Sequence, residues 1–486
     1  MNVNPITRLD YPDPDVIRVE DTYYMVSTTM HFMPGCEILQ SFDLVHWEHV
    51  TYVYETLDHT DAQQLKSGQN IYGQGMWAAS LRYHEGRFYI CFVANDTRKT
   101  YLYTSEKIDG PWKKQLIEGF YHDGSLLFDE DGRNYIVYGN DEIWITELNE
   151  DLTAPKKDGL HRLLVSDHKN PELGYEGSHI QKINGYYYIF LIHSLRDRWM
   201  RTEACFCSDS LEGEFTGGDV LCDDRGYCGQ GVAQGGIVDT PDGKWYAMLF
   251  QDSGAVGRIP ILLPVTWKDH FPVFGQNGHV PEEIEVHSTR PGYIYQPLVG
   301  SDDFCNGLLP RWQFNHDPDP QYYHLDALQG TYTITTREVC TELTQAVNTL
   351  TQRMSYPSCA AEVTVDASAL KEGDVAGLCA LQGCYAAVGI TKHHGKYEVL
   401  MLDKKEDGIL DMTEGTVVES HQMDFRLEAD FCNMKDEARC YYRVNKGDWL
   451  PIGTVHKLYF KLDHFTGCRF GLFCYCLLYT SPSPRD

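Results

Sequence analysis

The feature that most restricts the fold of this chain is a short phrase that occurs five times in its first 250 residues. Each copy consists of a turn, one or two further residues, a tyrosine and an apolar run. The five tyrosines are Tyr24, Tyr89, Tyr135, Tyr188 and Tyr246, so successive copies lie 46 to 65 residues apart. Propeller blades repeat about every 40–50 residues, with additional length in loops. The spacing therefore predicts five copies of one β-sheet unit.

The turns inside the copies favour tight β-hairpins. They are Glu85-Gly86, Asp131-Gly132, Asn184-Gly185 and Asp242-Gly243, with Glu20-Asp21 as a degenerate first copy. X-Gly pairs supply the positive φ that short hairpin turns require, and the flanking runs are rich in Tyr, Phe, Ile and Val. Radial closure of five such sheets protects their edges. We therefore predict an all-β chain that begins with a five-bladed β-propeller.

The repeat also places acidic residues at equivalent positions. Counting back twelve residues from the second to fifth tyrosines gives Trp77, Asp123, Glu176 and Gln234, and eleven residues before the first lies Asp13. Equivalent positions in a cyclic repeat lie at equivalent radii, so the three carboxylates should converge on the channel. Converging like charges cost free energy unless a proton is shared or their environments differ. Such a cluster therefore indicates a functional site.

Glycoside hydrolysis requires this kind of cluster. One carboxylic acid protonates the leaving oxygen, a second carboxylate activates water or attacks carbon, and a third can raise the pKa of the acid. Asp13 lies between two prolines that stiffen the backbone, which suits a base that holds one water. Glu176 has a longer side chain beside Tyr175, which suits a general acid. Asp123 is then the candidate modulator.

Two alternatives compete with this assignment. Asp15 lies two residues after Asp13 on the same predicted strand face, but it is out of step with the other copies. The acidic cluster could instead bind a cation in the channel, because hard cations prefer carboxylate oxygens. The sequence lacks the Asp-x-Asp-x-Asp-Gly spacing of a calcium loop, which disfavours that reading.

Five further residues are weaker candidates for substrate binding. Trp77 is either a core tryptophan or a wall for a sugar ring. Arg258 is either a surface arginine or a donor to sugar hydroxyls or a carboxylate, and Gln234 is an uncharged polar group predicted to face the channel. His31 and Phe32 lie in the loop segment TTMHFMPG, where a histidine is more often structural than a ligand.

Composition limits the partners. The formal net charge is −29, with no basic block, which disfavours nucleic acids and anionic membranes and favours a neutral or cationic substrate. The amino terminus shows no signal peptide and the chain no apolar run long enough to span a membrane, so we expect a cytoplasmic protein. In that compartment the sixteen cysteines should be free thiols.

The phrase fades after residue 274, which predicts a second domain. Residues 1–295 are expected to form the propeller and residues 301–476 a β-sandwich of jelly-roll type, joined by a Gly/Pro-rich connector at 275–300. The last ten residues, 477–486, contain Ser-Pro-Ser-Pro, which cannot complete a central strand. They resemble a disordered tail or a cloning or sequencing artefact. Residues 54–75 form a long polar loop, a candidate rim of the pocket.

The chain resembles glycoside hydrolase family 43. The resemblance is carried by six blocks in the family's order and spacing: YPDPDVIRVEDTYYMVSTT, PGCEILQSFDLVHWE, WAASLRYHEGRFYICF, SLLFDEDGRNYIVYGN, YEGSHIQKINGYYYIF and VDTPDGKWYAML. The segment from SDDFCNGLLPRWQFNHDPDP onward is similar to the β-sandwich of the family's β-xylosidase-type members. The resemblance implies an inverting mechanism, with Asp13 as general base, Asp123 as pKa modulator and Glu176 as general acid. It also implies that Trp77 and Arg258 line the sugar site, beneath a loop of the sandwich.

Two departures from the family pattern stand out. Many relatives carry a channel histidine that holds a hydrated metal ion, whereas this chain has Gln234 at that position. We therefore expect no required cofactor, and a channel calcium ion is the alternative. The sandwich is also shorter than in relatives, so we expect a missing edge or central strand. The family forms homo-oligomers in many cases, which makes a homo-oligomer possible here.

The leading functional hypothesis is an inverting, exo-acting β-1,4-xylosidase that acts on short xylo-oligosaccharides. An α-L-arabinofuranosidase, or an enzyme with both activities, is the alternative that the residues leave open. A retaining glycosidase, in which Asp13 attacks carbon, and a carbohydrate-binding propeller without turnover are further alternatives.

Overall fold

The computed structural model describes residues 3–413 and 415–476. Within these residues the chain forms 36 β-strands, three short 3-10 helices and no α-helix, which confirms the all-β prediction. The 3-10 helices are η1 (Lys66–Gly68), η2 (Leu343–Gln345) and η3 (Cys432–Met434). No helix in the described part is long and apolar enough to cross a membrane. The predicted tail, 477–486, lies outside the described residues.

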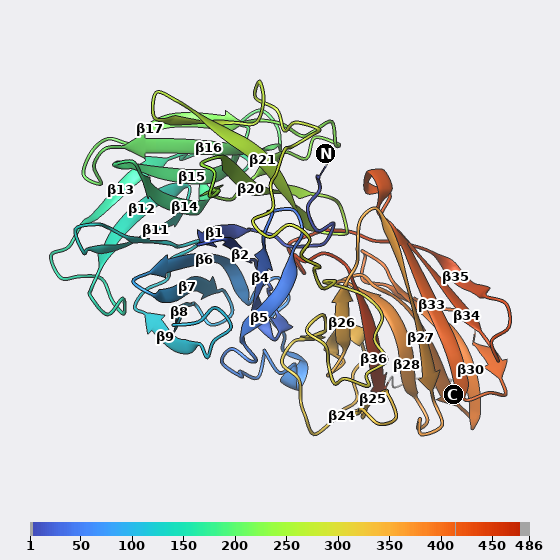
Figure 1. Ribbon diagram of the computed structural model, residues 1–486. Helices are drawn as coiled ribbons and strands as arrows, with labels where there is room; N and C mark the ends of the chain where they lie inside the picture. The colour runs from blue at the N-terminus through green and yellow to red at the C-terminus, as the bar shows by residue number, and fades with distance from the viewer. Residues whose placement is uncertain (1–2, 414, 477–486) are drawn as a thin grey trace.

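Five antiparallel sheets make up residues 15–274 (Figure 1). The first contains β1 (Asp15–Val19), β2 (Thr22–Val26), β4 (Gly35–Ser41) and β5 (Glu48–Tyr54). The second contains β6 (Met76–His84), β7 (Arg87–Ala94), β8 (Lys99–Ser105) and β9 (Lys113–Ile117). The third contains β10 (Ser125–Phe128), β11 (Asn134–Asn140), β12 (Glu142–Leu148) and β13 (His161–Ser166).

The fourth sheet contains β14 (Glu176–Ile183), β15 (Tyr186–Ser194), β16 (Arg201–Ser208) and β17 (Thr216–Leu221). The fifth contains β18 (Val232–Ala233), β19 (Ile237–Asp239), β20 (Trp245–Asp252), β21 (Arg258–Lys268) and β22 (Phe271–Phe274). Apolar clusters fill each contact between neighbouring sheets. One of these clusters joins Met25 of the first sheet to Met248 of the fifth, which closes the sheets into a ring.

The hairpins form where the repeated turns predict them. Glu85-Gly86 and Asn184-Gly185 are two-residue loops, because His84 pairs with Arg87 and Ile183 pairs with Tyr186. Gly86 and Gly185 have φ of 77° and 85°, and a side chain there would meet no atom within 4 Å. The backbone conformation therefore favours glycine at these positions, rather than lack of space.

The second domain is a β-sandwich. Its larger sheet runs in the order β3 (Phe32–Met33), β23 (Gln313–Asn315), β26 (Leu350–Arg353), β36 (Arg469–Cys476), β28 (Asp374–Leu381), β29 (Ala386–His393), β30 (Lys396–Lys404) and β31 (Leu410–Met412), with β32 (Thr416–Val418) also paired to β30. Its smaller sheet contains β27 (Ser358–Asp366), β33 (Gln422–Asp430), β34 (Glu437–Arg443) and β35 (Leu450–Lys457). A separate hairpin consists of β24 (Tyr323–Asp326) and β25 (Thr331–Ile334).

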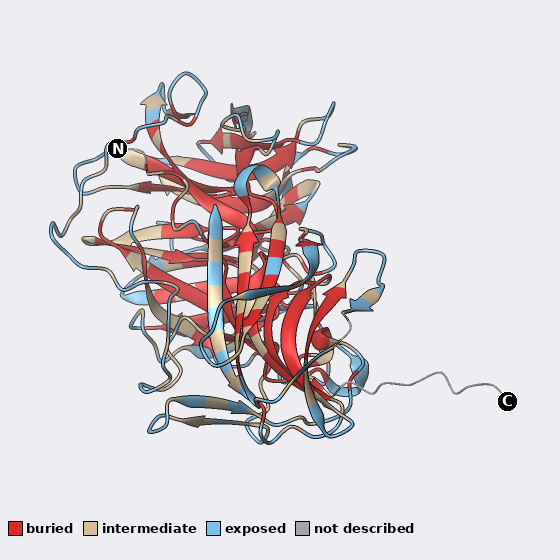
Figure 2. Cartoon of the chain, turned by 90° about the vertical axis from the view of Figure 1, so that its right-hand side faces the viewer, coloured by how far each residue is buried: buried red, intermediate tan, exposed pale blue. Residues whose placement is uncertain are grey.

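The two domains share structure as well as surface. Strand β3 belongs to the amino-terminal part of the chain, yet it pairs with β23 and extends the larger sandwich sheet. The sandwich core also includes Ala255 and Val256 from the loop that precedes β21. Buried segments accordingly run through both domains (Figure 2). Strand β36 lies between β26 and β28, so the larger sheet has no gap at its centre. Of the predicted missing edge or central strand, the central alternative does not hold for the described part of this sheet, and a missing edge strand stays a prediction.

Candidate active site

The backbone around the repeated position has the same unusual conformation in several sheets. Asp13, Asp123 and Gln234 have φ of 52°, 48° and 60°, in the left-handed region that few side-chain-bearing residues adopt. The strands that begin at Met76 and Glu176 have irregular pairing immediately after their first residues. Bulges and left-handed residues turn side chains out of the strand alternation. The inner strands therefore bring the side chains at their first turns together at one site, which is called the pocket below.

Both oxygens of the Asp13 carboxylate are held. Thr28 Oγ1 donates a hydrogen bond of 2.6 Å to Oδ2, and Arg258 Nη1 donates one of 2.8 Å to Oδ1. The side chain is buried, and Arg258 is buried as well. Charge-assisted hydrogen bonds of this length fix orientation strongly. Asp13 is therefore oriented by two donors from distant segments, the loop after β2 and the start of β21.

Glu176 is held through one oxygen only. Asn140 Nδ2 donates a hydrogen bond of 2.7 Å to Oε2, and His122 Nε2 lies 3.4 Å from the same atom. Of the described residues, none hydrogen-bonds to Oε1. The side chain is 18% exposed, so it opens to the pocket. Glu176 therefore presents one free oxygen to a ligand.

Asp123 lies close to both Glu176 and His122. The Gly177 amide donates a hydrogen bond of 3.1 Å to Oδ2, and His122 Nε2 lies 3.5 Å from the same oxygen. Burial raises the pKa of Asp123 to about 6, and the nearby carboxylates of Glu176 and Asp13 add to this shift while His122 opposes it. The environment of Asp123 therefore favours its protonated form more than that of an ordinary aspartate.

His122 is the basic residue that lies between Asp123 and Glu176. Burial favours the neutral ring, but the carboxylates of Asp123 and Glu176 outweigh it and raise the pKa of His122 to about 9. Its ring also lies 6.0 Å from that of Trp77. His122 therefore connects the two acids to the aromatic wall of the pocket.

The alternative base, Asp15, has a different environment. Its oxygens accept hydrogen bonds from the Leu81 amide and from Arg82 Nη1, both at 2.7 Å, and His179 Nδ1 lies at 3.1 Å. Burial alone would raise the pKa of Asp15, but Arg82 and His179 lower it. Asp15 thus joins the first, second and fourth sheets. Because Leu81, Arg82 and His179 contact both of its oxygens, Asp15 is a structural residue.

An aromatic wall stands next to the acids, and half of it comes from the sandwich. Phe465 lies in the loop between β35 and β36, and its ring centroid is 5.4 Å from that of Trp77. The Arg258 guanidinium lies 4.3 Å from the centroid of Phe465. Among the described residues, Arg258 Nε and Nη2 are buried without a hydrogen-bond partner. A sugar hydroxyl could satisfy these donors. The loop expected over the propeller mouth is therefore the segment that carries Phe465.

The remaining predicted residues lie around this pocket. The backbone amide of Gln234 donates a hydrogen bond of 2.7 Å to the Glu203 carboxylate. The Gln234 side chain packs closely on Gly177, and a Cβ added to Gly177 would lie 2.7 Å from Gln234 Cδ. His31 and Phe32 are 0% and 1% exposed and lie in the contact between the domains. The His31 ring makes tilted or edge-on contacts there with the rings of four residues: Phe32, Tyr72, His316 and His464. Their contact with substrate stays a prediction.

Sequence reasoning missed four residues of the site. His122 and Asn140 each adjoin a feature already identified, since His122 precedes Asp123 and Asn140 ends the apolar run of the third copy. Those neighbours are a signal that could have found them. Thr28 and Phe465 have no such signal, because their roles depend on contacts between distant segments.

The metal alternative can be tested against the donor set. Among the described residues, His122, Asp123 and Glu176 form the one group of three potential ligands whose atoms lie within 4.8 Å of one another. Calcium takes about six to eight oxygen ligands, whereas this group offers two carboxylates and an imidazole. The group does not fit calcium, and the side chain of Gln234 packs on Gly177. No step of the reaction proposed below passes through a metal ion.

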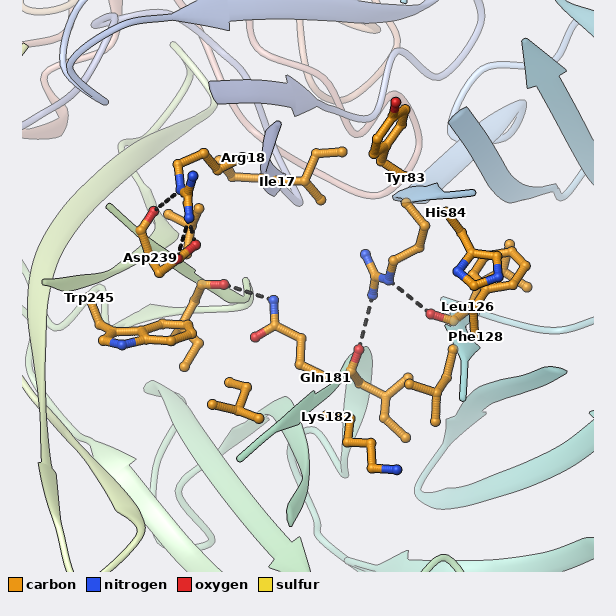
Figure 3. Close-up of a pocket in the computed structure, with 17 residues that line it drawn as sticks. Ile17, Arg18, Tyr83, His84, Leu126, Phe128, Gln181, Lys182, Asp239 and Trp245 are labelled. Atoms are coloured by element: carbon orange, nitrogen blue, oxygen red, sulfur yellow. Dashed lines mark hydrogen bonds and ion pairs between the residues drawn. The ribbon is translucent and has the colours of Figure 1, made fainter. Parts of the chain in front are cut away.

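A separate cavity of about 420 Å³ opens at the opposite end of the channel (Figure 3). Its walls come from the far ends of the innermost strands. Arg18 pairs there with Asp239, and the side-chain amide of Gln181 donates a hydrogen bond of 2.8 Å to the Ile237 carbonyl. These contacts join neighbouring sheets. None of the three predicted acids lines this cavity, so the candidate active site lies at the other mouth.

Comparisons with known proteins agree with this architecture. The family model for glycosyl hydrolases family 43 matches residues 3–272, and the model for the β-xylosidase C-terminal concanavalin A-like domain matches residues 301–483. A solved structure of a bifunctional GH43-CE protein from Bacteroides eggerthii superimposes with a TM-score of 0.91 at 42% identity. The alignment covers 97% of this chain and 61% of that one, so the chain spans about three fifths of that protein's length.

Two curated relatives carry different activity names. A β-xylosidase of Formosa agariphila is 26% identical, with coverage of 97% of this chain and 87% of the relative. A non-reducing-end α-L-arabinofuranosidase of Bacteroides ovatus is 25% identical, with coverage of 67% and 63%. The family model covers more than half of the residues. With its ring of five sheets, its convergent carboxylates and its appended sandwich, the chain belongs to glycosyl hydrolase family 43.

Proposed function

We propose that the chain is an inverting, exo-acting glycoside hydrolase that removes terminal xylose from xylo-oligosaccharides, a β-1,4-xylosidase. Asp13 is the proposed general base, Glu176 the general acid and Asp123 the modulator of the acid. The observation that carries the proposal is the convergence of three carboxylates with three different hydrogen-bond environments in one pocket. Different environments allow neighbouring acids to take different roles.

The contacts suit these roles. Thr28 and Arg258 orient Asp13 so that its carboxylate accepts a proton from the attacking water. Water oxygen bonds to the anomeric carbon as the glycosidic bond breaks, and Glu176 delivers its proton to the leaving oxygen. Asn140 and His122 engage Oε2 of Glu176, which leaves Oε1 as the oxygen that carries that proton. Inverting enzymes separate the two carboxyl groups by about 6.5–9.5 Å to admit the water.

The wall formed by Trp77 and Phe465 supports action on chain ends. A residue from the sandwich beside the acids narrows the mouth of the propeller, which favours a terminal sugar over the middle of a polymer. An α-L-arabinofuranosidase, alone or together with xylosidase activity, is the second candidate. It is favoured by the name of the Bacteroides ovatus relative, which matches two thirds of this chain.

The first experiment compares hydrolysis of p-nitrophenyl β-D-xylopyranoside and p-nitrophenyl α-L-arabinofuranoside by the wild type, Asp13→Ala and Glu176→Gln. We expect turnover of at least one substrate, and a loss of about two to four orders of magnitude in each variant. Asp131→Asn, on an exposed hairpin far from the pocket, is the control. The ratio of the two wild-type rates identifies the sugar.

Proton NMR of the first product distinguishes the mechanisms. An inverting enzyme releases α-xylose from a β-xyloside, and β-xylose as the first product would show a retaining enzyme. Folded wild type that binds xylo-oligosaccharide without cleaving any of these substrates would replace the hydrolase with a carbohydrate-binding propeller.

A further inference from the structure

A rim loop rich in arginine stands at the active-site mouth. It comprises residues 195–200, Leu-Arg-Asp-Arg-Trp-Met, between β15 and β16, and Arg201 follows it. Glu176 pairs with Ile192 near the end of β15, so the loop leaves the sheet at the same end as the catalytic acid. Three arginines between residues 196 and 201 are unusual in a chain with a net charge of −29.

Trp199 is the exposed aromatic of this loop. Its side chain is 45% exposed, and the Arg201 guanidinium carbon lies 5.3 Å from the centroid of a Trp199 ring. Arg198, the preceding residue, is 58% exposed at its side chain and contacts Asp197. A broad exposed ring flanked by guanidinium groups is a surface that can stack on a sugar and bind an anion.

Arg201 connects the rim to the catalytic pocket. Its Nε donates a hydrogen bond of 2.6 Å to Asp252, and its Nη atoms donate to none of the described residues. Its guanidinium lies 5.3 Å from the Phe250 ring, at the same distance as that of Arg258. Burial alone would lower the pKa of Arg201, but Asp252 and, at longer range, Glu176 raise it. Arg201 is therefore a buried cation within electrostatic reach of the general acid.

The loop is held in place before any ligand binds. Arg196 pairs with Asp167 of the neighbouring rim segment. The Met200 amide donates a hydrogen bond of 2.9 Å to Ser194 Oγ, and Asn170 Nδ2 donates one of 2.8 Å to the Ser194 carbonyl. Contacts that fix a binding surface in advance reduce the entropy lost on association. Arg196 thus anchors the loop, whereas Arg198 remains available to solvent.

We propose that Trp199, Arg198 and Arg201 form a rim subsite for a sugar unit that bears a carboxylate, next to the bond that is cleaved. The inference rests on the proposed function, because it places the unit on the leaving-group side of Glu176. The ring of Trp199 stacks on the sugar face, and the guanidinium groups bind the carboxylate. A uronic acid branch of a xylo-oligosaccharide has this chemistry.

The arrangement has an electrostatic reason. The carboxylates of Asp13, Asp123 and Glu176 lie in the pocket of a strongly acidic protein and would repel an acidic substrate. Arg198 and Arg201 supply local positive charge at the point where an acidic branch would lie. A purely structural loop would require the anchoring pair of Arg196 but no exposed Trp199 beside two further arginines.

The test measures kcat/KM for xylotriose and for xylotriose with glucuronic acid on the xylose next to the terminal one. The variants are Arg198→Gln and Trp199→Ala, both at exposed positions, and the control is Arg133→Gln, an exposed arginine paired with Asp131 in a distant hairpin. We expect the ratio of acidic to neutral kcat/KM to fall about fivefold in Arg198→Gln, the upper end of the usual effect of one exposed charge pair. Trp199→Ala should lower the same ratio, and Arg133→Gln should not.

Salt provides an independent readout. The wild-type ratio should fall between 0.05 and 0.5 M sodium chloride, because exposed charges are screened over about 4 Å at the higher concentration. An unchanged ratio in both rim variants and at both salt concentrations would overturn the rim subsite while leaving the hydrolase in place. If the wild type cleaves neither substrate, the proposed function fails. Calorimetric titration with the acidic oligosaccharide then decides the subsite: binding weakened by Arg198→Gln supports it, and no binding overturns it.

Discussion

Replacing Asp123 with asparagine should stabilise the protein at neutral pH while lowering its activity. The carboxyl group is buried, with its pKa raised from 3.8 to about 6. A carboxyl whose pKa is raised by folding binds its proton more tightly in the folded state than in the unfolded chain. The folded state therefore loses stability as pH rises from about 4 to about 6, and this loss persists at higher pH. Asparagine does not ionise and avoids that loss.

The magnitude follows from the shift. Two pKa units correspond to about 3 kcal/mol of lost stability at pH 7, and to about 1 kcal/mol at pH 4.5, where Asp123 in the folded protein is largely protonated. These are upper values, because the substitution also removes one carboxylate from beside His122. In domains of this size, 1 kcal/mol moves the melting temperature by about 2–4 °C.

Scanning calorimetry of wild type and Asp123→Asn at pH 7 and pH 4.5 tests this reasoning, with Asp131→Asn as the exposed control. We expect a clear rise in Tm at pH 7, a smaller one at pH 4.5, and a change within about 0.5 kcal/mol for the control. The pH profile of kcat/KM should change in Asp123→Asn if the residue tunes the acid. Destabilisation at pH 7, or the same gain at both pH values, would refute the argument from burial.

Three other predictions concern the same pocket. Arg258→Met should lower the free energy of unfolding by about 3–5 kcal/mol, measured by urea titration, because it leaves the buried Asp13 carboxylate without its cation; a loss below 1 kcal/mol would contradict this. Phe465→Ala should lower kcat/KM about five- to tenfold by removing the contact with Trp77, and Tyr83→Ala at the far side should not; equal effects would argue against a shared pocket. Dialysis against EDTA should leave kcat/KM unchanged, and activity that is lost and then restored by calcium would show a required metal.

The fold class was predictable because hairpin chemistry is local. The turn pairs Glu85-Gly86 and Asn184-Gly185 adopt the positive φ that their glycines favour, and the strands on either side pair as expected. These turns and the apolar runs beside them also predicted that each copy of the repeat forms one sheet. The convergence of Asp13, Asp123 and Glu176 was predictable for the same reason, since it depends only on each residue's place in the repeat.

The distinction between Asp13 and Asp15 needed partners from other segments. Both are buried aspartates two positions apart, and although the repeat and the flanking prolines favour Asp13 as the base, they do not show what either side chain contacts. In the structure, Asp13 binds Thr28 and Arg258 at the pocket. Asp15 instead contacts Arg82 and His179 between the sheets. The sequence position of each aspartate determines where its Cα lies on the strand, and the packing between sheets determines which residues its carboxylate contacts.

The sequence by itself determined the all-β class, the repeated hairpins and the meeting of three acids at one end of the innermost strands. Only the tertiary structure decided that Phe465 stands beside Trp77, that β3 extends the sandwich sheet and that Arg201 lies within reach of Glu176. The physical reason is range. Turn conformation and strand alternation depend on neighbouring residues, whereas these contacts depend on how whole sheets pack, and no spacing along the chain records that.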